Sequence, residues 1–286
     1  MSISTSPEIT VWIWTLRAIV AGNLAFWIWV ARGILAEARS DLPEASVSYR
    51  RRLLFLSSLF VLGCAFRSLL PRADVQRIVL YDGWASTVMV GRSVATIAEM
   101  AFMAQWALVL REGTPAGTRD LGWYVGRILV PLIGLAEAFS WYAVLTTNFI
   151  GNVLEQSTWT LCATLVVAAA LKRRAPAWRP FAQATAGMII PYILFMSLSD
   201  VPMYFRRWQL DQAWGHRYLS LAAGIRDAAE RTVLTRRWEL WHDEVAWMSL
   251  YFSAGVWVSL WLVRRSPEPV AAVSRNEQKS HSKFAS

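Results

Sequence analysis

The sequence predicts an all-α, polytopic integral membrane protein with seven transmembrane helices. Of its 286 residues, 55% are hydrophobic and 17% are charged, whereas about a quarter of the residues in a typical soluble domain are charged. Apolar stretches of about 20 residues, long enough to cross a bilayer as a helix, recur along the chain. The 17 tryptophans lie mostly near the ends of these stretches, where such side chains anchor helices at membrane surfaces.

Seven apolar stretches are bounded by charged or turn-forming residues. Each of them is long enough to form one membrane-spanning helix. The predicted spans are 11–31, 53–70, 85–110, 122–145, 152–171, 183–204 and 245–263. Together they define a single seven-helix transmembrane domain over residues 1–265.

Lysine and arginine are distributed unequally among the connections between these spans. Four segments together hold 16 of the 29 cations, namely 32–52, 111–121, 172–182 and the chain from 264 onward. Short basic connections stay in the cytoplasm, so we expect the N-terminus outside, the C-terminus inside and a location in the cell (cytoplasmic or inner) membrane. This topology accounts for the net charge of +9, and we expect no nucleic-acid partner.

Two segments outside the spans have a composition of their own. The long connection 205–244 is predicted to be an extracytoplasmic helical segment that covers the bundle as a gating lid or a static cap. The polar tail 266–286 is expected to be disordered in the cytoplasm. The apolar face of the covering segment is predicted to consist of Leu219, Ala222, Ile225, Ala229 and Val233.

Eight ionisable residues fall inside the predicted spans. A charge in the hydrocarbon costs at least about 2.5 kcal/mol, so such residues face the bundle interior and pair with one another. Seven of the eight lie in the outer half or near the middle of their span; the exception is Arg127, at the cytoplasmic end. The eight residues are Arg17, Arg67, Arg92, Glu99, Arg127, Glu137, Glu155 and Asp200.

Helical spacing brings several of these residues onto shared faces. Arg92 and Glu99 are seven residues apart, and Asn148, Asn152 and Glu155 recur at intervals of four and three. We therefore predict a polar pocket that opens to the extracytoplasmic side. Interhelical ties that replace apolar packing are the alternative explanation. The predicted ligand-binding residues are Arg17, Arg67, Arg92, Glu99, Glu137, Asn148, Asn152, Glu155 and Asp200.

We predict no cofactor for this chain. Retinal requires a lysine in the last span, and residues 245–263 contain none. Haem held between helices requires histidine pairs, and none of the three histidines lies in a predicted span. Metal ligands could come from His216, His242 and Glu244, but adjacent residues on a helix point in different directions, so no metal site is expected.

Two classes of function fit this pattern, and the lipid bilayer is the expected surrounding in both. The first is a non-enzymatic bundle that binds, transports or senses a small anionic ligand. The second is an intramembrane enzyme that acts on a lipid or isoprenoid head group at the outer leaflet, with Glu99, Glu137 and Glu155 as the candidate acid and base residues. A membrane-protein partner or a second copy of the chain could also bind the charges.

Overall fold

The computed structural model describes residues 6–37, 43–114, 117–173 and 175–269. Within these ranges, seven helices are long and apolar enough to cross a membrane. The prediction of an all-helical chain with seven helices that could span a membrane is therefore confirmed. Each predicted span falls on one of these helices, but the ends differ by up to nine residues, as at the start of the second span (predicted 53, observed Glu44). Side chains on the outer surface of the bundle, such as Val11, Phe55 and Ile97, are large, apolar and exposed, as expected for contact with lipid.

The first five spans are single helices and the last two are interrupted. The single helices are α1 (Pro7–Glu37), α2 (Glu44–Leu69), α3 (Val88–Glu112), α4 (Leu121–Thr146) and α5 (Phe149–Lys172). The sixth span consists of α6 (Arg179–Phe195), the π-helical turn η3 (Met196–Asp200) and α7 (Val201–Ala213), and the seventh of α9 (Trp238–Leu250), the π-helical turn η4 (Tyr251–Gly255) and α10 (Val256–Arg265). Short 3-10 turns η1 (Trp84–Ser86) and η2 (Pro176–Trp178) precede α3 and α6.

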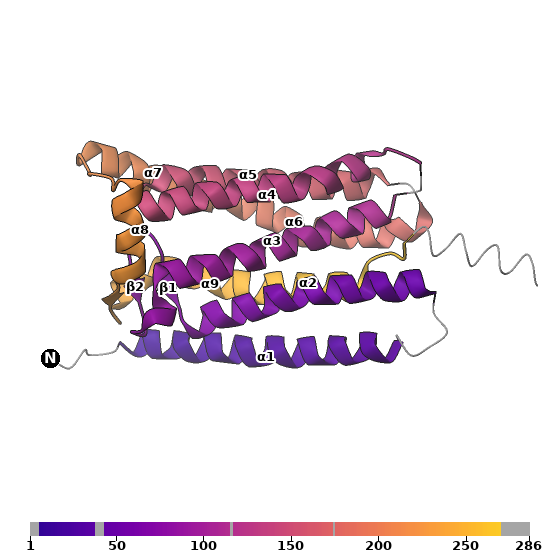
Figure 1. Ribbon diagram of the computed structural model, residues 1–286, viewed down its shortest axis with the longest axis horizontal. Helices are drawn as coiled ribbons and strands as arrows, with labels where there is room; N and C mark the ends of the chain where they lie inside the picture. Colours follow the sequence, from indigo (N-terminus) through magenta and orange to yellow (C-terminus); the bar gives the residue numbers. More distant parts are fainter. Residues whose placement is uncertain (1–5, 38–42, 115–116, 174, 270–286) are drawn as a thin grey trace, which may run out of the picture.

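The first six spans pack side by side in chain order, and the seventh packs against the first three, with α10 against α1, α2 and α3. Small residues allow close helix contact: a side chain on Gly63 would meet Ala98, and one on Gly151 would meet Phe139 and Ala143. Trp12 on α1 contacts Trp241 on α9 near one end, and Arg264 on α10 pairs with Glu37 of α1 at the other. The first and seventh spans therefore run parallel: both begin at one end of the bundle and both end at the other (Figure 1).

One end of the bundle is covered by a small sheet and a crossing helix. Strands β1 (Arg72–Ala73) and β2 (Ile78–Val79) are antiparallel, and β3 (Val233–Leu234) pairs with β2 in parallel. Helix α8 (Leu221–Glu230) lies across the ends of the spanning helices (Figure 1). We call these elements the cap.

The segment 205–244 differs from the single helical stretch predicted for it. It is divided among α7, α8, β3 and α9, because Gly215 takes a positive φ of 64° after α7 and Ser220 then caps α8. The predicted apolar face is also wrong: Ile225 is exposed, while Gly224 and Ala228 are buried. A side chain on Gly224 would collide with the backbone of Leu145, so small residues form the inner face of α8.

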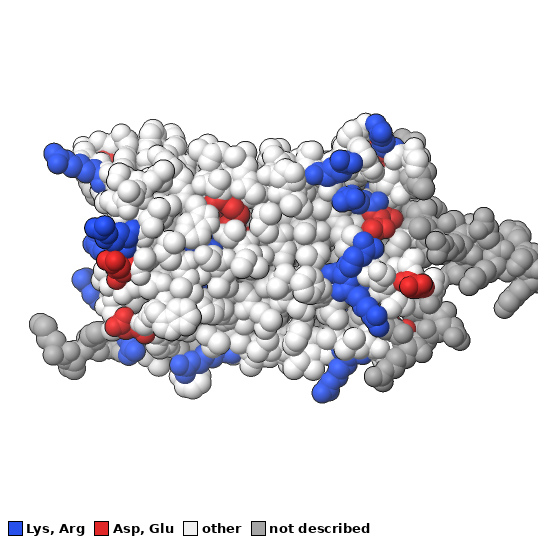
Figure 2. Space-filling view, in the orientation of Figure 1, with Lys and Arg blue, Asp and Glu red and all other residues white. Residues whose placement is uncertain are grey.

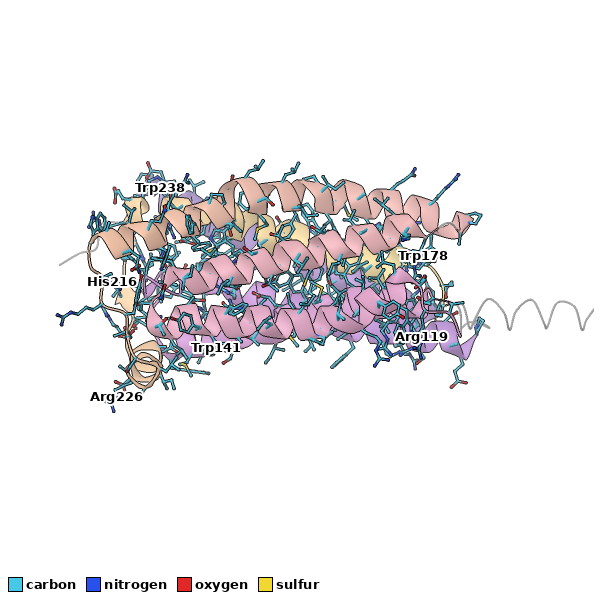
Figure 3. The ribbon with its side chains drawn as sticks, turned by 90° about the horizontal axis from the view of Figure 1, so that it is seen from above. Arg119, Trp141, Trp178, His216, Arg226 and Trp238 are labelled. Carbon is cyan, nitrogen blue, oxygen red and sulfur yellow. The ribbon has the colours of Figure 1, made fainter. Side chains whose placement is uncertain are left out.

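Charged side chains gather at the two ends of the molecule. Apart from one small acidic patch, the middle of the visible surface is almost free of charge (Figure 2). His216 and Arg226 lie at the cap end, and Arg119 and Trp178 lie at the opposite end (Figure 3). Of the predicted tail, Ser266 and Glu268 are bound by Arg50. Residues 270–286 lie outside the described part of the chain.

Candidate functional site

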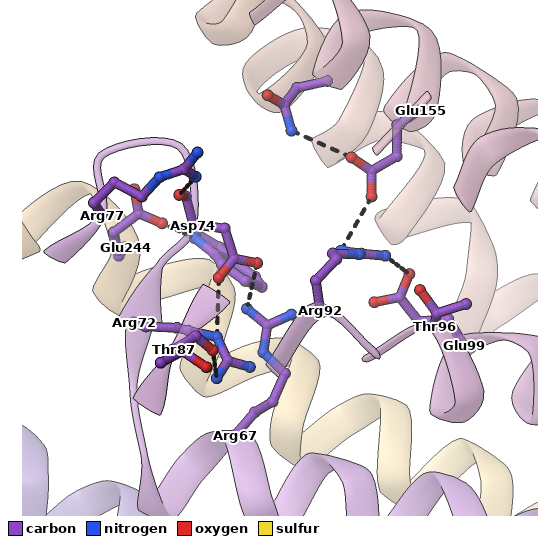
Figure 4. A network of polar contacts seen from close by, with 12 residues as sticks. Arg67, Arg72, Asp74, Arg77, Thr87, Arg92, Thr96, Glu99, Glu155 and Glu244 are labelled. Carbon is purple, nitrogen blue, oxygen red and sulfur yellow. Dashed lines mark hydrogen bonds and ion pairs between the residues drawn. The ribbon is translucent and has the colours of Figure 1, made fainter. Parts of the chain in front are cut away.

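Arg92 lies at the centre of a group of buried carboxyls. It belongs to the second turn of α3, and 5% of its surface is exposed. Its Nη2 atom lies 3.1 Å from Glu99 Oε2 on the same helix and 2.6 Å from Glu137 Oε2 on α4. Its Nη1 atom lies 3.6 Å from Glu155 Oε1 on α5 (Figure 4). One cation therefore joins three helices, and we call these four residues the Arg92 cluster.

The carboxyl group of Glu137 is positioned by a second donor from α3. Thr96 follows Arg92 by one helical turn, and its hydroxyl donates a hydrogen bond to Glu137 Oε2 at 2.6 Å. The indole of Trp141 in turn donates to the Thr96 hydroxyl oxygen at 3.1 Å. Glu137 thus receives two hydrogen bonds from one face of α3, which fixes the packing of α3 against α4 at this depth.

The carboxyl group of Glu155 is positioned from its own helix. Asn152 precedes it by three residues on α5, and the amide Nδ2 donates to Glu155 Oε2 at 3.2 Å. The predicted polar face of α5 therefore exists and is directed toward Arg92. Asn148 has a different role, since its side chain accepts a hydrogen bond from the backbone of Ile150 and caps the start of α5.

Several buried polar atoms of this region have no hydrogen-bond partner among the described residues. In the Arg92 cluster they include Arg92 Nε and Glu137 Oε1, and close by they include Asn152 Oδ1. A buried polar atom left unpaired costs about 1–3 kcal/mol. These atoms are therefore available to water or to a small polar ligand.

Asp74 forms the centre of a second cluster toward the cap. It follows β1, and its Oδ1 and Oδ2 atoms lie 2.9 Å from Arg72 Nε and 3.6 Å from Arg67 Nη2. Burial alone would raise the pKa of Asp74, but the guanidinium groups of Arg67, Arg72 and Arg92 together hold it below its ordinary value. Burial also lowers the pKa of Arg72 to about 10, and nearby Asp74 opposes this shift. We call Arg67, Arg72 and Asp74 the Asp74 cluster.

Arg77 connects this cluster to the cap. It has a positive φ of 59° in the turn between β1 and β2. Its guanidinium group donates to the backbone oxygens of Asp74 at 2.6 Å and Val144 at 2.8 Å, and its Nε atom lies 2.7 Å from Asp227 Oδ2 on α8. A single buried arginine therefore joins the β-hairpin, the end of α4 and the crossing helix.

Besides Asn148, two of the predicted site residues lie apart from both clusters. Arg17 is exposed on α1, where it donates to the Tyr81 hydroxyl at 3.3 Å and lies over the ring of Trp14. Asp200 is buried in η3, where, among the described residues, its carboxyl group interacts electrostatically with Glu244 and Arg207 and with neither cluster centre. The structure therefore brings together Arg92, Glu99, Glu137, Glu155 and Asn152, places Arg67 nearby, and separates Arg17 and Asp200.

The candidate metal ligands are not gathered at one place. The His216 ring lies 3.5 Å from the Thr147 hydroxyl, His242 lies 2.9 Å from Asp243, and Glu244 accepts a hydrogen bond from Gln76 at 3.4 Å. Among the residues that the structure describes, no three histidine, cysteine or acidic side chains are arranged to hold a metal ion.

Arg72, Asp74, Arg77 and Asp227 were not expected at the site, because the sequence places them in connections rather than in spans. One signal was present: an aspartate stands between two arginines at 72–77, directly before the apolar run 78–80. A charged turn next to a short apolar strand is consistent with a hairpin that folds back on the bundle.

No protein-family model, curated protein or solved structure matches this chain.

Proposed function

We propose that this multi-pass membrane protein binds a small anion together with protons, and that it transports or senses this anion at the Arg92 and Asp74 clusters. The observation that supports the proposal is the contact of one buried guanidinium group, Arg92, with carboxyls from three helices. We further propose that the cap faces the extracytoplasmic side of the cell membrane, as the distribution of lysine and arginine predicts.

The balance of charge explains why protons would take part. The two clusters contain three arginines and four acids, so they carry one excess negative charge when every group is ionised. An unbalanced charge inside a membrane protein is costly. A bound anion would add to the excess, and its binding is therefore favourable only when protons bind to the carboxyls as well.

The hydrogen-bonding groups support the same mechanism. Arg72 Nη2 and Arg92 Nε are buried donors without a hydrogen-bond partner among the described residues, and guanidinium groups suit the oxygens of phosphate and carboxylate ions. Carboxyl oxygens of both Glu99 and Glu137 lie within 3.1 Å of the same atom, Arg92 Nη2, and two buried carboxyls this close together are favoured when one of them holds a proton. Arg17, which was also predicted to bind the anion, lies outside this arrangement.

Thermal unfolding of the purified protein with inorganic phosphate, sulfate or succinate at pH 5 and pH 8 tests this proposal. We expect at least one anion to stabilise the wild-type protein, and to do so more strongly at pH 5. A concentration of about 100 times Kd would contribute about 2.7 kcal/mol. Proteoliposomes that contain a pH-sensitive dye then separate the two roles, since a transporter acidifies the interior when the anion is added outside and a sensor does not.

Three variants make the test specific. Arg92→Gln should abolish the response to the anion, and Arg17→Gln serves as the control because Arg17 contacts neither cluster. Glu155→Gln keeps the cation and removes one acid, so anion binding should persist at higher pH than in the wild type. The proposal is wrong if no anion stabilises the protein at either pH, or if folded Glu155→Gln protein shows the wild-type pH dependence.

A further inference from the structure

A groove of about 830 Å³ lies on the surface between α2 and α4, at the opposite end of the bundle from the cap. Its floor is one face of α3, formed by Ala104, Ala107, Leu108 and Arg111, which are spaced three, one and three residues apart. None of the described residues that line this groove belongs to the Arg92 cluster. The polar pocket predicted from the sequence to open at the extracytoplasmic side is a different site, and it stays a prediction.

Small residues account for the depth of the groove. Ala104 and Ala107 keep the floor low, and Gly126 leaves the adjoining wall of α4 without a side chain. A Cβ atom on Gly126 would lie 2.7 Å from Arg111 Cγ and 3.0 Å from the backbone oxygen of Ala107. The absence of a side chain at Gly126 therefore lets Arg111 extend along the groove.

Positive charge is concentrated at the end of the groove nearest the end of the bundle. Four arginines and one acid, Glu44, line it, and Figure 2 shows basic side chains gathered over the ends of α2, α3 and α4. Neither Arg51 nor Arg111 has an ion-pair partner among the described residues. The other two lining arginines are Arg52, which lies 3.3 Å from Glu112, and Arg127, which lies over the ring of Trp123.

The rest of the groove is apolar. Phe55, Leu56, Leu108 and Val130 line it toward the middle of the bundle, and Phe55 is 64% exposed. Arg51 and Phe55 are four residues apart, so the change from charged to apolar lining occurs over about 6 Å along α2. A soluble anion would use only the charged part, whereas an amphiphile would use both.

We propose that this groove binds an anionic phospholipid, with its phosphate among Arg51, Arg111 and Arg127 and one acyl chain along Phe55, Leu108 and Val130. The order of charge and apolar surface matches the order of head group and chain in a lipid at a membrane surface. Basic pockets between helices at the cytoplasmic side bind anionic head groups, and this end of the bundle is the one predicted to be cytoplasmic. The inference does not depend on the function proposed for the Arg92 cluster.

The test measures lipid binding to the purified full-length protein in neutral detergent. Native mass spectrometry would compare dioleoyl phosphatidylglycerol with dioleoyl phosphatidylcholine, which has the same chains and no net charge. We expect the anionic lipid to bind at least about tenfold more tightly, since each arginine near a membrane surface contributes an attraction to anionic lipid. The double variant Arg51→Gln/Arg111→Gln should remove this preference.

Matched controls separate a specific site from general attraction between charges. The double variant Arg217→Gln/Arg226→Gln removes the same charge from exposed residues at the cap end and should leave the preference unchanged. Ala104→Leu fills the floor without altering charge and should weaken binding of both lipids. Equal binding of the two lipids, equal loss in the two double variants, or displacement of the lipid by millimolar inorganic phosphate would overturn the proposal.

Discussion

The guanidinium group of Arg72 occupies the space in which any residue other than glycine at position 91 would place its side chain. Arg72 is fully buried, and its Nε atom lies 2.9 Å from the carboxyl group of Asp74. It reaches the start of α3, where its Nη1 atom lies 3.4 Å from the backbone oxygen of Thr87. The lack of a side chain at Gly91 is therefore what allows the β-hairpin to attach to α3.

Gly91→Ala is expected to displace Arg72 and to destabilise the protein. Forcing a methyl group into a well-packed interior costs about 1–3 kcal/mol, and the displaced arginine also leaves Asp74 with one cation fewer. Thermal unfolding in detergent measures the loss. Gly134→Ala is the matched control, because a Cβ atom at Gly134 in α4 meets nothing within 4 Å; equal stability of the two variants would contradict the role assigned to Gly91.

Asp74 should make the stability of the protein depend on pH in the acid range. Its pKa in the folded protein lies below its ordinary value, because Arg67, Arg72 and Arg92 outweigh the effect of burial. The folded state therefore binds the proton less readily than the unfolded state. The resulting stabilisation is present above the ordinary aspartate pKa of about 3.9, and it is lost as the pH falls from there through the folded-state pKa.

Asp74→Asn should therefore lower the melting temperature at pH 7, and the difference from the wild type should shrink as the pH approaches 3. Unfolding curves for both proteins between pH 3 and pH 7 measure this change. Asp82→Asn is the control, because Asp82 is exposed and, within the described part of the chain, its carboxylate accepts only a local hydrogen bond from Gly83. A difference that stayed constant over the whole range would show that the charge of Asp74 is not responsible.

Arg77→Gln should detach the cap while leaving the spanning helices folded. The substitution removes the ion pair with Asp227 on α8, and a hydrogen bond from a charged group contributes about 1.5–3 kcal/mol; Asp227 keeps its second partner, Arg231. Amide hydrogen exchange should become faster in 221–230 and 233–234 and remain unchanged in α4 and α5. Arg226→Gln, on the exposed face of α8, should not alter the exchange; faster exchange throughout the chain in Arg77→Gln would mean that Arg77 stabilises the whole bundle.

The seven spans could be predicted because their signal is local. Each span needs only a sufficient length of apolar sequence. The contact of Arg92 with Glu99 could be predicted for a related reason, since residues seven apart share a helical face. The presence of carboxyls from α4 and α5 around Arg92 followed from the cost of an isolated charge in the membrane, which indicates that a partner exists but does not identify it.

A covering segment over 205–244 was predicted, but the contacts that attach the cap could not be, because they join segments that are far apart in the chain. Arg77 and Asp227 are separated by 150 residues, and neither belongs to a periodic pattern. The inner face of α8 was placed incorrectly because hydrophobicity favoured Ile225, whereas the close approach to Leu145 requires Gly224. Arg17 was expected at the site from its depth along α1, but depth does not specify which side of a helix faces the bundle.

The orientation of the bundle can be tested with single cysteines at its two ends. Asp82 lies in the cap-end connection between α2 and α3, Arg119 lies at the opposite end, and both side chains are exposed. The native cysteines, Cys64 and Cys162, are buried and should not react. A membrane-impermeant maleimide should therefore label Asp82→Cys in intact cells and should label Arg119→Cys only after permeabilisation, because the basic connections are predicted to be cytoplasmic. Labelling of Arg119→Cys in intact cells would reverse the orientation, and it would place both the Arg92 cluster and the basic groove on the opposite sides of the membrane from those proposed.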